Sequence, residues 1–255
     1  MGQPVSTPWS APVFPPPPHS WHGVRSVLVP FDPDPGGMAR TLPPALEPLP
    51  GPGIVAFLSY GWGANVRIHP FNEAVVLVPA RCGGTEGNYV PFIYVTTDEA
   101  LIPGREAAGW PKKLADITWE RSGDRIDVSV ARWGETLLAF EGEVDAVAGA
   151  AGTGDTDAVE RLELLVAAGL RPTLNYKLIP GPGDEIEVEE VTSTSLEIVA
   201  SQIETGSGSL ACSSSVDDPV ADVVRSVTGP FVAMVSDNTV PCGAVLRRVE
   251  GRVVR

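Results

Sequence analysis

Two adjacent lysines are the residues of this sequence best suited to covalent chemistry. The chain holds three lysines against fifteen arginines, and Lys112 and Lys113 stand side by side after Trp110-Pro111. An arginine stays protonated in proteins, whereas a buried lysine can lose its proton and act as a nucleophile. Because arginine supplies nearly all of the other positive charge, the two lysines at this point indicate that an amine is needed here. We therefore expect one of the two amines to react covalently.

An amine that attacks a carbonyl has to be neutral. Free lysine has a pKa of about 10.4, so only roughly one molecule in two thousand is neutral at pH 7, and desolvation or a second cation must favour that form. Successive side chains of a strand point to opposite faces, so Lys112 and Lys113 are not expected to enter the same pocket. The alternative is that both are exposed at a strand edge, where lysine is common.

Other kinds of site have little support in the sequence. The three histidines, His19, His22 and His69, do not pair with another ligand at helical spacing, and there is no Cys-x-x-Cys, so we expect no metal. A phosphate-binding P-loop and a Gly-x-Ser-x-Gly nucleophile elbow are also absent from the sequence. We expect no cofactor.

The composition narrows the class of partner. The chain has 255 residues and a net charge of -14, which disfavours nucleic acid and anionic membrane surfaces. A carboxylate substrate would need a local cation in its site for the same reason. No apolar run approaches a membrane span and no signal peptide is recognised. The three cysteines are dispersed and odd in number, which indicates a reducing, cytoplasmic location without disulfides.

The pattern of short apolar runs and turns predicts a β-rich protein. Residues 1–20 are rich in proline and read as an N-terminal arm, and residues 21–255 read as a single domain. Two helices are expected, over Asp157–Ala168 and Asp218–Val224, and Gly206–Ser209 reads as a turn. The main strands are expected at Val24–Phe31, Ile54–Tyr60, Glu73–Pro79, Tyr89–Thr96, Lys113–Glu120, Arg125–Trp133, Thr136–Val144, Leu174–Ile179, Ile186–Ile203 (as one strand or two), Phe231–Val235 and Val245–Val254. This is an α+β fold, mainly β, with an antiparallel sheet that closes into a barrel-like shape.

The lysine segment also resembles that of a known family. Gly104-Arg105-Glu106, followed by Trp110-Pro111-Lys112-Lys113-Leu114, is similar to the active-site segment of the acetoacetate decarboxylase family. Arg171-Pro172-Thr173-Leu174-Asn175-Tyr176-Lys177-Leu178-Ile179-Pro180 resembles a second block of that family, and Pro43–Glu47 a third. The blocks occur in matching order along most of the chain. The resemblance implies a barrel-containing fold, homo-oligomers, Lys112 as the Schiff-base lysine and Lys113 as a neighbouring cation.

The other active-site residues of that family are only partly matched in this sequence. Glu73 falls at the family's active-site glutamate, where it would shuttle protons, and Trp110 would wall the pocket. The family's second pocket glutamate falls on Leu58, so this sequence lacks it. The pocket arginine is displaced by one residue, and a shifted gap would place Arg25 in the pocket to bind substrate.

These departures leave two reactions open, together with a third role. The first is decarboxylation of a small 3-oxo acid through a Lys112 iminium. With Leu58 in place of a carboxylate, the pocket is less hostile to a retained acid group, which suits an aldolase-dehydratase that condenses a 2-oxo acid such as pyruvate with an aldehyde. The third is a barrel that binds or cyclises a ligand without covalent catalysis. In the first two, the partner is a small oxo acid.

Overall fold

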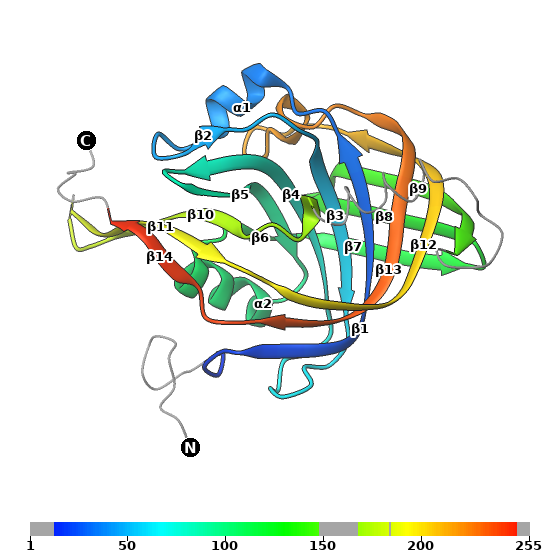
Figure 1. The fold of residues 1–255 in the computed structure, drawn as a ribbon, viewed down its shortest axis with the longest axis horizontal. Coiled ribbons are helices and arrows are strands. Elements are labelled where there is room, and N and C mark those ends of the chain that lie inside the picture. The colour runs from blue at the N-terminus through cyan, green and yellow to red at the C-terminus, as the bar shows by residue number, and fades with distance from the viewer. Residues whose placement is uncertain (1–12, 148–167, 184, 249–255) are drawn as a thin grey trace.

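The fold is built around one large, curved sheet. A computed structural model describes residues 13–147, 168–183 and 185–248 (Figure 1). In that part of the chain fourteen strands form one sheet, in the order β14-β11-β10-β5-β4-β3-β1-β13-β12-β9-β8-β7, with β2 on β4 and β6 on β5. The strands are β1 (His19–Phe31), β2 (Glu47–Pro48), β3 (Gly53–Tyr60), β4 (Phe71–Cys82), β5 (Thr85–Val95), β6 (Lys112–Leu114), β7 (Asp116–Ser122), β8 (Arg125–Arg132), β9 (Glu135–Val147), β10 (Thr173–Pro180), β11 (Ile186–Thr194), β12 (Glu197–Cys212), β13 (Val227–Val240) and β14 (Ala244–Arg248).

The predicted mainly β, α+β class is confirmed, with two differences in the sheet. The sheet is mixed, because β10 and β6 both run parallel to β5. It is strongly curved in Figure 1, but within the described residues its two edge strands, β14 and β7, do not pair, so it is not a closed barrel.

Helical structure is sparse among the described residues. Helix α1 (Pro35–Thr41) begins at an Asp34 cap, and α2 (Asp98–Pro103) begins at a Thr97 cap. A π-helical turn, η1 (Gly104–Ala108), continues α2 directly. A short 3₁₀ turn, η2 (Val220–Asp222), replaces the expected helix over Asp218–Val224. None of the described helices is long and apolar enough to cross a membrane.

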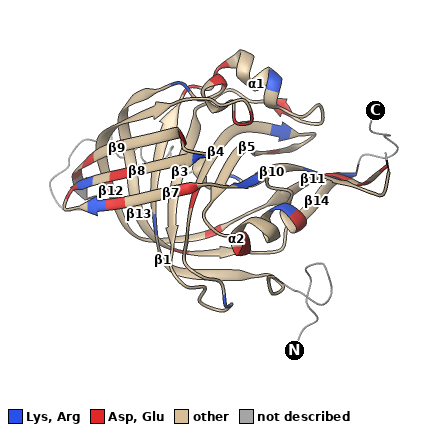
Figure 2. Ribbon diagram, turned by 180° about the vertical axis from the view of Figure 1, so that it is seen from behind, with Lys and Arg blue, Asp and Glu red and all other residues tan. Residues whose placement is uncertain are grey.

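The central strands pack a core on both faces of the sheet. In β1, Val27 and Val29 belong to one apolar cluster, whereas Val24 and Leu28 belong to a second cluster on the opposite face. Strands β3 and β4 alternate between the same two clusters. Burial on both faces explains why these strands read as near-continuous apolar runs instead of alternating with polar residues. Charged residues gather along the outer strands β7, β8 and β9, while β3 carries none (Figure 2).

Several predicted boundaries change. The expected strand over Lys113–Glu120 is two strands, because β6 pairs with β5 and β7 pairs with β8. The expected turn at Gly206–Ser209 is instead the interior of β12. Glycine is needed there because a Cβ at Gly206 would lie 2.1 Å from the Glu143 carbonyl oxygen. The expected helix over Asp157–Ala168 lies outside the described residues except for Ala168.

Candidate active site

The lysine segment is positioned by the turn that precedes it. Helix α2 passes into η1, which ends at Gly109 with a left-handed φ of 76°. That conformation suits glycine, and a Cβ there would also lie 2.6 Å from Cβ of Lys177. The chain then turns through Trp110 into β6, which pairs in parallel with the end of β5.

Strand β6 sends its two lysines to opposite faces of the sheet. Lys112 pairs in register with Ile93 and Lys113 with Tyr94, and these two β5 residues belong to different core clusters. Lys112 Nζ lies 2.7 Å from Glu73 Oε2, and both side chains are buried. Lys113 instead donates to Asp218 Oδ1 at 2.8 Å. The two amines therefore do not share a pocket, as strand alternation predicted.

Lys113 accordingly does not supply a cation beside Lys112, which corrects the arrangement implied by the family resemblance. On its face of the sheet, the fully buried Asp218 also accepts hydrogen bonds from Tyr94 Oη and Arg132 Nε, both at 3.0 Å. Burial alone would raise the pKa of Asp218, but the hydrogen bonds from Lys113 and Tyr94 and the nearby charges lower that pKa below its ordinary value. Arg132 also donates to the Leu114 carbonyl, so this cluster holds β6 in place.

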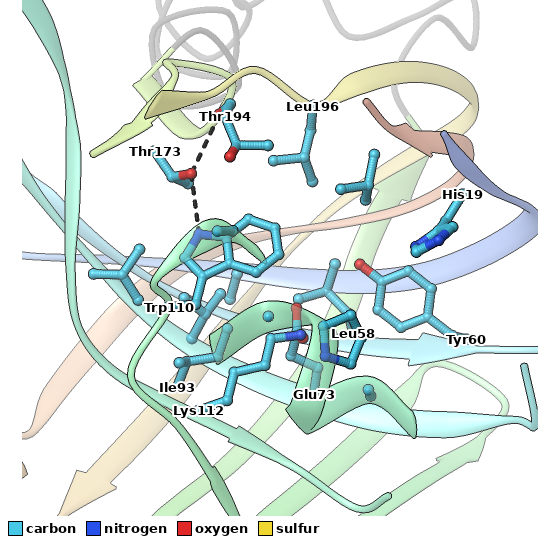
Figure 3. A pocket seen from close by; sticks show the side chains of 18 of the residues that line it. His19, Leu58, Tyr60, Glu73, Ile93, Trp110, Lys112, Thr173, Thr194 and Leu196 are labelled. Carbon is cyan, nitrogen blue, oxygen red and sulfur yellow. Dashed lines mark hydrogen bonds and ion pairs between the residues drawn. The ribbon is translucent and has the colours of Figure 1, made fainter. Parts of the chain in front are cut away.

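Lys112 and Glu73 lie in an apolar cavity of about 170 Å³. Figure 3 shows the amine next to the carboxylate, below Trp110 and beside Leu58. Most of the lining is aliphatic or aromatic and comes from β1, β3, β4 and β5, with further residues from α2, η1, β10, β11, β12 and β13. Water-excluding walls strengthen the electrostatic interaction of any charged group in the cavity with its neighbours.

Glu73 is placed in the cavity by its position on β4. Its register partner on β3 is Leu58, and its partner on β5 is Val95. Leu58 lines the cavity, so the position that resembles a second pocket glutamate presents an apolar side chain here. Glu73 is thus the carboxylate that contacts the amine.

Trp110 forms one wall of the cavity. Lys112 Nζ lies 5.1 Å from the centre of the Trp110 ring. The indole nitrogen donates to Thr173 Oγ1 at 3.1 Å, and Thr173 Oγ1 donates to the Thr194 carbonyl at 3.2 Å (Figure 3). This chain of hydrogen bonds fixes the ring between β6 and the β10–β11 pair.

Arg25, expected to bind substrate in this pocket, does not line the cavity. It pairs in register with Ser59 and donates to Ser59 Oγ at 3.3 Å. Leu58 and Tyr60, the neighbours of Ser59 on β3, line the cavity, so alternation along the strand turns Ser59 and Arg25 to the other face. Arg25 instead borders a shallow polar depression with His22 and Asn72.

Tyr60 and His19 are among the cavity residues that were not predicted from the sequence. Tyr60 is buried, and burial, followed by the charge of Glu73, raises the pKa of its phenol well above the ordinary value even though a hydrogen bond with Asn238 opposes the shift. His19 lines the cavity at the start of β1 and its Nε2 contacts the Pro15 carbonyl at 2.8 Å. In the sequence, Tyr60 stands out as a tyrosine at the end of an apolar strand. Because side chains alternate along a strand, its spacing of two residues from Leu58 could have placed it on the same face.

The arrangement suits proton transfer and amine chemistry more than metal binding. Within the described residues, no group of three or more histidine, cysteine, aspartate or glutamate side chains is arranged to hold a metal ion. A buried amine in contact with a buried carboxylate can pass a proton to it and attack a carbonyl carbon. The phenol of Tyr60 stays protonated at neutral pH and is available as a hydrogen-bond donor.

Comparisons with known proteins agree on one family and one fold. A family model described as acetoacetate decarboxylase matches residues 2–248. An acetoacetate decarboxylase of Ralstonia nicotianae is 26% identical over 245 residues, covering 94% of this chain and 92% of the relative. Acetoacetate decarboxylase 1 of Bradyrhizobium diazoefficiens is 29% identical over 134 residues, and the match spans about half of each protein, 52%.

Solved structures of similar fold include more than one kind of enzyme. The crystal structure of acetoacetate decarboxylase from Legionella pneumophila matches with a TM-score of 0.80 and 20% identity, over 97% of this chain and 95% of that one. The enduracididine biosynthesis enzyme MppR complexed with pyruvate matches with a TM-score of 0.76 and 19% identity, over 97% of this chain and 99% of that one. At these identities the likeness concerns the fold.

Proposed function

We propose that this chain, which belongs to the acetoacetate decarboxylase family, is a cofactor-free lyase that forms a Schiff base between Lys112 and a small oxo acid. The observation that carries the proposal is the 2.7 Å contact between Lys112 Nζ and Glu73 Oε2 inside an apolar cavity. An apolar cavity of about 150 Å³ accommodates a molecule the size of benzene. The volume here, about 170 Å³, therefore suits a substrate with few heavy atoms.

In the proposed mechanism Glu73 moves the protons. The Lys112 ammonium gives a proton to Glu73, and the neutral amine adds to the carbonyl carbon. Glu73 returns that proton to the carbonyl oxygen, which becomes a hydroxyl. Glu73 then takes a second proton from the nitrogen of the adduct and passes it to the hydroxyl, which leaves as water, and a protonated iminium remains. Trp110 holds the amine from one side, and the apolar walls exclude competing water.

The first reaction of this iminium is decarboxylation of a 3-oxo acid. The bond between the α-carbon and the carboxylate breaks, its electron pair enters the iminium to form an enamine, and carbon dioxide leaves. Glu73 then delivers one proton, taken up from solvent, to the enamine carbon. Addition of water releases the ketone and restores the Lys112 ammonium.

Leu58 favours a second reaction of the same amine. At position 58 the cavity presents an apolar side chain, so no carboxylate from this position repels a bound acid group. A 2-oxo acid iminium would lose a proton from its neighbouring carbon to Glu73, and the resulting enamine would add to an aldehyde. The aldehyde oxygen takes up the proton held by Glu73 and becomes a hydroxyl. Glu73 then removes a second proton from the carbon next to the iminium and passes it to the hydroxyl, which leaves as water while a carbon–carbon double bond forms. Addition of water to the iminium releases the product and restores the Lys112 ammonium. The fold shared with MppR, solved with pyruvate, is compatible with this alternative.

Borohydride trapping tests the proposal. The folded protein is incubated with acetoacetate, pyruvate or longer analogues and then reduced with borohydride. Mass spectrometry of the intact protein measures the added mass, and mass spectrometry after digestion locates the modified residue. We expect the adduct on Lys112. Lys113→Ala is the matched control and should retain the adduct, whereas Lys112→Ala should abolish it. No adduct with any of these acids would refute the Schiff-base proposal and leave a binding or cyclising role. Carbon dioxide release from acetoacetate distinguishes the two lyase reactions.

A further inference from the structure

The wall of the cavity beyond Trp110 carries polar groups that the mechanism does not use. Thr194 is 1% exposed and lines the cavity, and its hydroxyl oxygen has no hydrogen-bond partner among the described residues. A buried hydroxyl without a hydrogen-bond partner destabilises the folded protein, so such a group points to a ligand that would satisfy it. Figure 3 shows Thr194 across the Trp110 ring from Lys112.

Arg171 contributes a positive charge to the same wall. It lines the cavity two residues before Thr173, and Thr173 is the register partner of Thr194. Apart from Lys112 and His19, Arg171 is the one basic residue among the lining residues, and no ion pair joins it to another described residue. Lys112 is already paired with Glu73, so Arg171 is the cation available to an incoming anion.

We propose that Arg171 and Thr194 bind the carboxylate of the oxo acid whose carbonyl reacts with Lys112. The inference rests on the proposed function, because it assigns the second end of the same substrate. Guanidinium and hydroxyl donors suit a carboxylate, and this wall keeps it away from the negative charge of Glu73. A chain of net charge -14 repels an acid at long range, so a local cation is needed to hold it.

The position of this subsite bears on the reaction. A carboxylate held by Arg171 and Thr194 is anchored, which stabilises the bound acid instead of promoting its expulsion. Retention of the acid group is what carbon–carbon bond formation requires and decarboxylation does not. The subsite therefore favours the second of the two reactions.

Acid–ester pairs provide the test. The protein is titrated with two pairs of ligands, pyruvate with methyl pyruvate and acetoacetate with methyl acetoacetate. Binding is followed by tryptophan fluorescence, since Trp21 and Trp110 line the cavity. We expect Arg171→Gln to raise the Kd of each acid by about tenfold or more, and Thr194→Val to raise it less, with the Kd of the esters changed less than about twofold. Arg25→Gln, an arginine outside the cavity, is the matched control.

Three outcomes would overturn the carboxylate subsite. One is an equal shift for acid and ester in Arg171→Gln. Another is wild-type protein that does not prefer acid to ester. The third is an acid-specific loss in Trp21→Phe instead, since the Trp21 indole nitrogen is also buried without a partner at the cavity. Fluorescence does not require an adduct, so a missing Lys112 adduct would refute the Schiff base without deciding the subsite. Thermal unfolding confirms that each variant is folded.

Discussion

Gly104 offers the sharpest test of how the amine is positioned. A Cβ at this residue would lie 2.5 Å from Lys112 Cδ and 2.7 Å from Lys112 Cε. Carbon atoms in contact are ordinarily about 3.5–4.0 Å apart, so in Gly104→Ala the lysine chain has to move by about 1 Å. The flexible side chain yields more easily than the backbone, and the shift changes the position of its terminal amine relative to Glu73.

The expected cost falls on reactivity and not on stability. A misplacement of about 1 Å at a reacting group lowers a rate by on the order of 100-fold. The Gly104 backbone is helical, with φ -60° and ψ -44°, so its conformation accepts alanine without strain. In a helical position alanine can add up to about 1 kcal/mol to the free energy of unfolding relative to glycine. We therefore expect the rate of Lys112 adduct formation to drop by about two orders of magnitude at an unchanged or higher unfolding temperature.

The assay compares rates of borohydride-trapped adduct by intact mass, with unfolding temperature measured in parallel. Gly229→Ala is the control, because a Cβ at Gly229 meets no atom within 4 Å. Adduct formation by Gly104→Ala within about threefold of the wild-type rate would show that the lysine chain relaxes without losing its geometry, and the reasoning would be wrong.

Two further substitutions probe the groups that face the two lysines. Glu73→Gln keeps the shape of the side chain but cannot accept the Lys112 proton, so the rate of adduct formation should fall by about 10²–10⁴-fold. The rate is measured by borohydride trapping of samples quenched at successive times. An unchanged rate would exclude Glu73 as the proton carrier. Asp218→Asn leaves Lys113 and Arg132 without their shared carboxylate and should lower the free energy of unfolding by about 3–5 kcal/mol at pH 7, measured by denaturant titration. Because the folded pKa of Asp218 is lowered, its contribution is present above the unfolded value of about 3.9 and is lost as pH falls through the folded pKa. The acid limb of the stability curve should therefore be shallower in Asp218→Asn, and parallel limbs would contradict that assignment.

Local patterns in the sequence determined the β-rich class and most strand positions. The apolar runs at Val24–Phe31 and Ile54–Tyr60 lie within β1 and β3, because strands buried on both faces need apolar residues at most positions. The scarcity of lysine drew attention to Lys112, and alternation along a strand was enough to predict that Lys113 faces away from it. These features depend on short-range geometry, which a single sequence displays.

The tertiary structure decided what surrounds the amine. Glu73 meets Lys112 only because β4, β5 and β6 are neighbours in the sheet, and Thr194 reaches the same cavity through β10 and β11, which lie far along the chain. Arg25 misses the cavity because its register partner is Ser59 and not Leu58. A shift of one residue in register turns every side chain of a strand to the other face. Register is set by long-range pairing and packing, so the sequence could propose the nucleophile but not the complete set of groups around it.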